Sequence, residues 1–217
     1  MPSAPVHLCV ARIIADELKV KSHEQFFLGS VAPDSVNLYG FAPKEIRYEA
    51  HNRSADLSQW KKNAVALYNS MSRDDEDFAK GVLTHILTDI FWDELVQPNM
   101  LSKLSGDNED YETLREKKWQ ELYRFNSLLV SQEWYAEVLR TLSKASPCNY
   151  RNIDSDMMDK YRNYLCTDYS DKLLVDKPKV LSEDMITLTA MATLTFINEN
   201  DLLYFKCSRQ RPKILVE

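Results

Sequence analysis

The stretch GVLTHILTDIFWDE, residues 81–94, decides the fold expected for this chain. Its spacing predicts a helix with apolar side chains on most sides, so we expect this helix to be buried nearly all round. Two polar residues, His85 and Asp89, nevertheless stand in its middle. Residues four apart lie about 40° apart around a helix, one turn above the other. His85 and Asp89 therefore share one face, and they need partners because a lone buried charge is costly.

The spacing of this pair leaves two interpretations open. His85 and Asp89 form either a structural polar pair, hydrogen-bonded to each other and their neighbours or exposed, or one half of a metal site. The HxxxD pattern is common in helices, so a metal site requires further ligands from elsewhere in the chain.

Length and composition favour one soluble globular domain. The chain has 217 residues, of which 44% are hydrophobic and 28% charged. This suits a single domain with a sizeable core, or one domain with a small appendage. Only 4 glycines and 8 prolines occur, which argues against an architecture built of many β-turns.

Nearly every periodic segment has the helical period, and no alternating strand is evident, so the fold class is expected to be all-α. The pattern predicts helices over residues 3–19, 23–32, 54–72, 75–97, 109–129, 131–145, 155–167 and 182–204. Residues 33–52, with Pro33, Gly40 and Pro43, are expected to form an irregular loop. Residues 1–205 would form one multi-helix bundle, followed by an irregular, solvated tail over 206–217.

Charge and cysteine usage restrict the partners and the compartment. The formal net charge of −6 argues against a stable nucleic-acid partner but allows a small phosphorylated substrate. The 4 cysteines form no CxxC pair, which indicates a reduced, cytoplasmic protein. Neither a signal peptide nor a transmembrane segment is expected. The oligomeric state is not predicted.

Only 4 histidines occur in the chain, which makes their positions informative. His7 lies in the first predicted helix, and His51 stands in RYEAHN just before a later one. Asp34 directly follows the apolar run FFLGSVAP, residues 26–33, so a carboxylate stands where a buried helix ends. The fourth histidine, His23, opens a polar helix start and is expected to be exposed.

The segments FFLGSVAPD (26–34), HN (51–52) and GVLTHILTDIFWDE (81–94), preceded by a histidine in the first helix, resemble the zinc-dependent phospholipase C family in its broad sense. That family includes shorter cytoplasmic bacterial members. The resemblance implies an all-α bundle of the phospholipase C/P1 nuclease type. It implies that one metal is surrounded by Asp34, His51, His85 and Asp89. It also implies a second metal bound by His7, with Asp89 bridging the two.

This ligand set is chemically consistent. Imidazoles with carboxylates suit Zn²⁺, and also Mn²⁺ or Fe²⁺, better than metals that prefer thiolates. Two such metals activate a water molecule and hold phosphoryl oxygens. We therefore expect a phosphoester hydrolase with a mono- or dinuclear centre, most simply zinc, and a metal-bound hydroxide as nucleophile. Asp34 is a catalytic candidate as well as a ligand.

Arg47 and Arg53 flank His51 and are candidates for binding the phosphate in a bidentate manner. The alternative for both is an ordinary surface salt bridge. Asp93, near the end of the predicted helix, is either an acceptor behind the ligands or an exposed residue. The segment YETLREKKWQELY, residues 111–123, is interpreted as a solvated helix face with pairs at helical spacing.

Phospholipid-cleaving members of the family hold a further zinc with downstream His and Glu ligands. No histidine follows His85 here, so that subsite is absent or is built from carboxylates such as Asp93 and Glu94. Two other functions remain open. One is a degenerate, non-catalytic member acting as a helical interaction or regulatory module. The other is an HD-type nucleotide phosphohydrolase, although the adjacent His-Asp pair of that class is missing.

Overall fold

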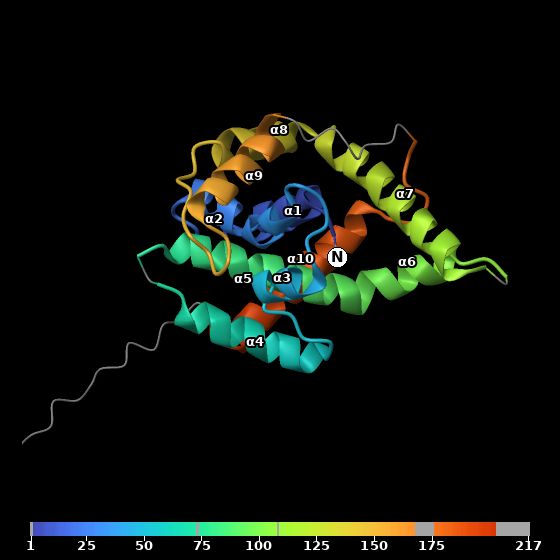
Figure 1. Ribbon diagram of the computed structural model, residues 1–217, viewed down its shortest axis with the longest axis horizontal. Helices are drawn as coiled ribbons and strands as arrows, with labels where there is room; N and C mark the ends of the chain where they lie inside the picture. Colours follow the sequence, from blue (N-terminus) through green and yellow to red (C-terminus); the bar gives the residue numbers. More distant parts are fainter. Residues whose placement is uncertain (1, 73, 108, 168–175, 203–217) are drawn as a thin grey trace, which may run out of the picture.

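The computed structural model describes residues 2–72, 74–107, 109–167 and 176–202, and in these ranges all regular structure is helical (Figure 1). The only β-type pairing in these ranges is an isolated bridge between Tyr150 and Ile153. The predicted all-α class is thus confirmed. The tail predicted over 206–217 lies outside the described residues.

The α-helices in chain order are α1 (Ala4–Ile14), α2 (His23–Gly29), α3 (Lys44–Ala50), α4 (Leu57–Ser70), α5 (Glu76–Phe91), α6 (Gln97–Leu104), α7 (Tyr111–Val130), α8 (Glu133–Leu142), α9 (Ser155–Thr167) and α10 (Glu183–Glu199). A 3₁₀-helix, η1 (Ala32–Asn37), and a π-helix, η2 (Trp92–Val96), complete the set. None of the helices in the described ranges combines the length and hydropathy that crossing a bilayer requires.

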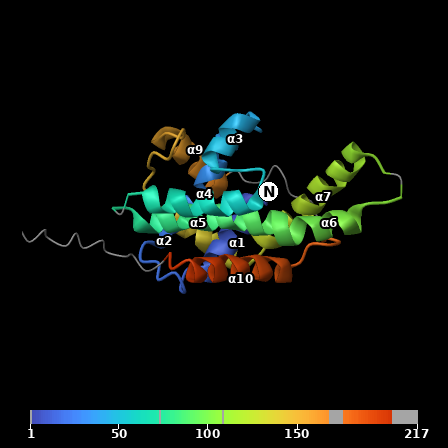
Figure 2. The same cartoon turned by 90° about the horizontal axis from the view of Figure 1, so that it is seen from below.

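Helix α5 is the centre of the bundle. Every residue from Asp77 to Phe91 is buried, as predicted for the stretch that includes His85 and Asp89. The helix contacts α1, α2, α4 and α10, and Figure 1 shows it passing through the middle of the molecule. Figure 2 shows α10 along the face opposite α3 and α9. Since α5 has neighbours on all sides, polar side chains on it have little access to solvent.

Helices α2 and α5 approach each other unusually closely, through glycines. A Cβ atom placed on Gly81 of α5 would lie 2.2 Å from the carbonyl oxygen of Phe26 and 2.9 Å from the Cα of Gly29. Only the absence of a side chain on both glycines allows this backbone contact. As a result, the C-terminal end of α2 lies directly against the middle of α5.

Aspartates cap four of the described helices at their N-termini. The side chains that accept hydrogen bonds from backbone N–H groups three residues on are those of Asp56, Asp75, Asp110 and Asp154, at 2.6, 3.3, 2.7 and 2.8 Å, at the starts of α4, α5, α7 and α9. Such caps satisfy N–H groups that have no partner inside the helix.

The irregular loop predicted over 33–52 is wrong in part. It contains most of η1 and the whole of α3, Lys44–Ala50. Helix α3 buries only Ala50, so it shows no apolar periodicity in the sequence. Pro43 stands at its N-cap, where a proline is tolerated because no helical N–H is required there.

The sequence predicts that the helix beginning at residue 75 ends at residue 97. This end is also wrong, because helical structure continues past Pro98 in α6. Proline has no N–H to donate to the carbonyl of Glu94, four residues earlier. The chain widens into the π-turn of η2 just before it, where the N–H of Gln97 donates to the carbonyl of Trp92, five residues back, and α6 follows. The first and last predicted helices are shorter than expected, ending at Ile14 and Glu199.

Candidate metal centre

Helices α1 and α5 supply three of the side chains at the candidate metal centre. His85 and Asp89 lie one turn apart on α5, and the Nε2 atom of His85 is 3.7 Å from Oδ2 of Asp89. The ring of His7, from α1, stacks on that of His85 with 3.8 Å between centroids and 11° between planes. The Nε2 atom of His7 lies 3.6 Å from Oδ1 of Asp89. The two oxygens of Asp89 therefore face different histidines.

Asp34 and His51 complete the cluster from the segment between α2 and α4. Asp34 lies in η1, directly after Pro33, and His51 is the C-cap residue of α3. The Nε2 atom of His51 is 3.3 Å from Oδ1 of Asp34 and 3.7 Å from Oδ2 of Asp89. The other oxygen of Asp34 lies 3.9 Å from Nε2 of His7. The structure thus brings together all five side chains predicted as metal ligands.

Backbone carbonyls orient two of the imidazoles. The Nδ1 atom of His85 is 2.9 Å from the carbonyl oxygen of Ser30, which the close approach of α2 places beside α5. The Nδ1 atom of His51 is 2.8 Å from the carbonyl oxygen of Arg47, one turn earlier in α3. A carbonyl only accepts, so each Nδ1 carries a proton, and in the neutral form of each ring Nε2 presents a lone pair to the cluster.

Several buried polar atoms at the cluster have no hydrogen-bond partner within the described part of the chain. They are Nδ1 and Nε2 of His7, Nε2 of His51 and of His85, and both carboxylate oxygens of Asp89. Buried polar atoms are almost always paired, and each exception requires a cause. Nitrogen lone pairs and carboxylate oxygens facing one another fit a cation between them.

The spacing of these atoms agrees with metal ligands better than with hydrogen bonds. Two atoms that each lie about 2.1 Å from one zinc ion are about 3.4 Å apart in a tetrahedral arrangement. The nitrogen-to-oxygen distances in the cluster run from 3.3 to 3.9 Å. Two groups have all their ligand atoms within 4.8 Å of one another: His7, His85 and Asp89, and Asp34, His51 and His85. These buried groups could hold a metal ion.

Burial controls the protonation of the cluster. It lowers the pKa of His85 to about 4, and burial together with the charge of His85 lowers the pKa of His7 well below its usual value. Burial raises the pKa of Asp89 to about 7. Burial would also lower the pKa of His51 and raise that of Asp34, but the close contact between these two side chains and the nearby charges outweigh it in both cases. His7 and His85 are thus neutral at pH 7, the form that binds metals.

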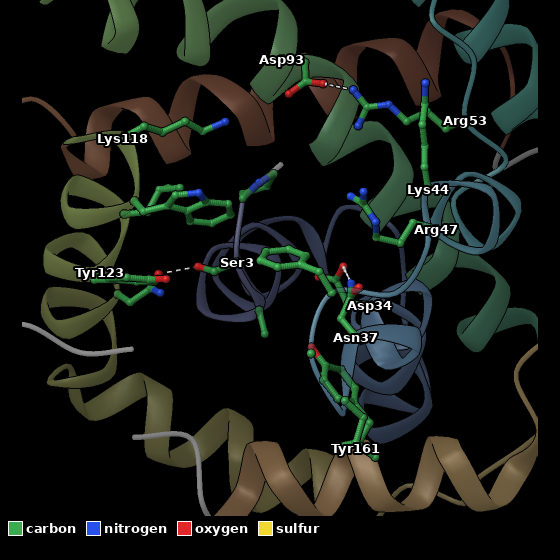
Figure 3. A pocket seen from close by; sticks show the side chains of 18 of the residues that line it. Ser3, Asp34, Asn37, Lys44, Arg47, Arg53, Asp93, Lys118, Tyr123 and Tyr161 are labelled. Atoms are coloured by element: carbon green, nitrogen blue, oxygen red, sulfur yellow. Dashed lines mark hydrogen bonds and ion pairs between the residues drawn. The ribbon is translucent and has the colours of Figure 1, made fainter. Parts of the chain in front are cut away.

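A cavity of about 580 Å³ reaches the cluster at Asp34, and both predicted phosphate contacts line it (Figure 3). Arg47 projects into the cavity, with its Nε donating to the carbonyl of Ala42 at 2.9 Å. Arg53 lies over the ring of Trp60, 4.4 Å from its centroid, and forms a salt bridge with Asp93 at 2.7 Å. The alternative interpretation of these arginines is an ordinary surface salt bridge. It holds for Arg53 only in part, because its salt-bridge partner, Asp93, also lines the cavity.

The interpretation of residues 111–123 as a solvated face holds for one side of α7 only. Arg115 and Glu112 form the expected exposed pair at 3.0 Å. On the other side, Lys118 and Trp119 line the cavity. Trp119, Leu122 and Tyr123 lie at helical spacing, and this pattern could have indicated that one side of α7 faces inward.

Comparisons of the chain with family models, with curated proteins and with solved structures return no match.

Proposed function

We propose that this chain is a metal-dependent phosphoester hydrolase of the phospholipase C/P1 nuclease type. The observation that carries the proposal is the convergence of five buried His and Asp side chains next to a cavity with a basic lining, in which both oxygens of Asp89 lack hydrogen-bond partners among the described residues. The resemblance over the first part of the chain gives the same five ligands: His7, Asp34, His51, His85 and Asp89.

A divalent ion such as Zn²⁺, bound by these residues, would supply an activated water and charge for the phosphoryl oxygens. The remaining work is done by the side chains of the protein. Asp34 is 8% exposed, whereas Asp89 and the three histidines are completely buried. Asp34 thus stands between the cavity and the rest of the cluster, so a substrate phosphoryl group reaches the centre beside its carboxylate.

Arg47 and Arg53 are placed to orient that phosphoryl group. Guanidinium groups present paired N–H donors that match two phosphoryl oxygens. The Nε of Arg53 is buried and has no hydrogen-bond partner in the described ranges, and the salt bridge to Asp93 fixes the side chain on the cavity wall. Ordered donors lose little conformational entropy when the substrate binds.

The test compares wild type with Asp89→Ala and His51→Ala for metal content and for hydrolysis of para-nitrophenyl phosphate and bis(para-nitrophenyl) phosphate. Each protein is loaded with Zn²⁺, Mn²⁺ or Fe²⁺, and circular dichroism checks that it is folded. We expect both variants to lose metal and at least about 100-fold in turnover. Asp77→Ala is the matched control, because it removes another buried carboxylate of α5 and should retain both properties.

Two results would contradict the proposal. The first is a variant that has lost its metal but still cleaves either ester at the wild-type rate. The second is a metal-loaded wild type that cleaves neither ester, which would favour the non-catalytic helical module.

A further inference from the structure

Two adjoining cavities lie beside the cluster. The inner cavity, about 580 Å³, reaches Asp34, and the outer cavity, about 510 Å³, extends away from it. Both are lined by Arg47, Lys118 and Trp119. Pockets of about 300–1,000 Å³ take small organic ligands. The space is therefore larger than a phosphoryl group alone requires, and most of it faces the part of the substrate that does not react.

The charge of the lining changes with distance from the cluster. The charged residues of the inner cavity are Lys44, Arg47, Arg53, Lys118, Asp34 and Asp93, four cationic and two anionic. Those of the outer cavity are Arg47, Arg115 and Lys118, with no carboxylate among its described lining residues. The whole chain has a formal charge of −6. Cations are thus concentrated here against the overall balance, and of the three outer cations Arg115 is also paired with Glu112 at 3.0 Å.

The cations come from separate elements and converge on one space. Figure 3 shows Lys118, on α7, and Arg47, on α3, pointing into the cavity from opposite sides. Burial lowers the pKa of Lys118 and the charge of Arg53 lowers it further, while Asp93 raises it. Positive charges held near one another in a partly buried place favour an anion between them.

Two of the aromatic rings that line both cavities already lie under cations of the protein. Arg47 lies over the ring of Phe41, and Lys118 over that of Trp119, each 5.8 Å from the ring centroid. Aromatic cages bind quaternary ammonium groups through such ring faces, but here the protein's own cations occupy them. The rings of Trp119 and Tyr123 stack, with 6.1 Å between centroids, and both line the inner cavity, where they offer apolar surface to an uncharged ligand body.

We propose that the substrates of this site are small organic phosphates that carry a second anionic group. The reacting phosphoryl group lies at the cluster end, beside Asp34 and Arg53. Arg47, which lines both cavities, lies between the two anionic groups and contacts both, and the second group binds between Arg47 and Lys118, with Arg115 at the outer edge. The body that joins them lies against Trp119. This inference rests on the proposed function, and it excludes zwitterionic phosphates that end in a quaternary ammonium group.

Binding of three phosphonates, which a phosphoester hydrolase does not cleave, tests the inference. Phenylphosphonate is compared with para-phenylene bisphosphonate and with para-(trimethylammonio)phenylphosphonate, by calorimetry on the metal-loaded protein at constant ionic strength. We expect the bisphosphonate to bind about tenfold more tightly than phenylphosphonate, and the ammonium compound less tightly. Equal affinities for the first two, tighter binding of the ammonium compound, or no binding of any of them would overturn the inference.

Substitutions locate the second anion site. Lys118→Gln and Arg115→Gln should each abolish most of the preference for the bisphosphonate while leaving the affinity for phenylphosphonate within about twofold. Lys117→Gln is the matched control, since it makes the same change in charge on α7 but lies outside both cavity linings. A preference that survives both test variants, or that Lys117→Gln removes equally, would contradict the assignment.

Failure of this inference can be distinguished from failure of the proposed function. Hydrolysis of simple esters without any preference for a second anion would leave the function standing and remove the inference. A clear preference in binding, together with no hydrolysis of any ester, would show an anion-binding site that is not an enzyme of this class.

Discussion

Helix α5 carries two buried carboxylates with opposite surroundings. Asp77 accepts hydrogen bonds from the backbone N–H groups of Lys21 and Ser22 at 3.0 and 2.7 Å, and from Nζ of Lys80 at 3.3 Å. Asp89 accepts none from the described residues, and its oxygens face histidine nitrogens at 3.6 and 3.7 Å. The protein itself satisfies Asp77, whereas Asp89 belongs to a group that could hold a metal ion. Burial of a carboxylate alone therefore does not indicate a metal site; burial beside other ligand atoms and without hydrogen-bond donors is the more informative feature.

The same neighbour, α2, defines both surroundings. Its N-cap residue, Ser22, donates to Asp77, and the carbonyl of its C-cap residue, Ser30, binds His85 one turn from Asp89. The Gly29–Gly81 contact holds α2 against α5 between these two points. The surroundings of both carboxylates therefore depend on the packing of α2 against α5.

The largest effect is expected from Gly81→Ala, which would disturb both carboxylates together. The new Cβ would lie 2.2 Å from the backbone oxygen of Phe26, which cannot move as a flexible side chain can. We expect the free energy of unfolding in urea to fall by about 3 kcal/mol or more. In the control Gly106→Ala, the nearest atom is 3.4 Å away on the Glu109 side chain, so little change is expected. Equal stabilities of the two variants would show that the close approach is unimportant.

The second largest effect is expected on metal affinity, and it should distinguish Asp89 from Asp77. Asp89→Asn keeps the shape of the side chain but removes its negative charge, and we expect metal affinity to fall by at least about 100-fold in competition with a chelator. Asp77→Asn, the same change on the same helix, should leave the affinity unaltered because Asp77 lies outside the cluster. A parallel loss in both variants would mean that the effect comes from folding and not from ligation.

Removal of the metal should distinguish the same variants by stability. A ligand that binds only the folded state at about 100 times its Kd stabilises it by about 2.7 kcal/mol. Dialysis against a chelator should therefore lower the Tm of wild type and of Asp77→Asn, and restoring Zn²⁺ should raise it again. Asp89→Asn should show the same Tm with and without metal; a metal-dependent rise in that variant would contradict the ligand assignment.

The smallest effect concerns Asp77 alone. Asp77→Ala leaves the N–H groups of Lys21 and Ser22 without their acceptor, and we expect a loss of about 1–3 kcal/mol in the free energy of unfolding. Metal content measured on the same preparation should remain that of wild type. A variant with normal stability but reduced metal would reverse the roles given to the two carboxylates.

The parts of the fold that the sequence could predict are those with strong periodicity. Residues 81–94 predict a buried helix because their apolar side chains surround it, and α5 is buried from Gly81 to its end at Phe91. Burial is only partial in η2, where Leu95 is 38% exposed. Helix α3 was not predicted, because it buries only one residue and so has no apolar periodicity. Helix α6 was not predicted, because a proline normally ends a helix. The π-turn that accommodates Pro98 has no recognisable sequence pattern.

The site was predictable in its residue types but not in its surroundings. The resemblance carried by His7, Asp34, His51 and the HxxxD pair implied the five members of the cluster. The carbonyls of Ser30 and Arg47 that orient His85 and His51 could not be inferred, since backbone atoms carry no sequence signal. The cationic contribution of α7 was missed because the charges around Lys118 resemble those of an exposed helix.

The most direct test of the account is elemental analysis of the protein purified without chelators, before and after incubation with Zn²⁺. The account predicts at least about one equivalent of a transition metal per chain after incubation, held through gel filtration. Less than about half an equivalent, with no uptake of added Zn²⁺, Mn²⁺ or Fe²⁺, would contradict it.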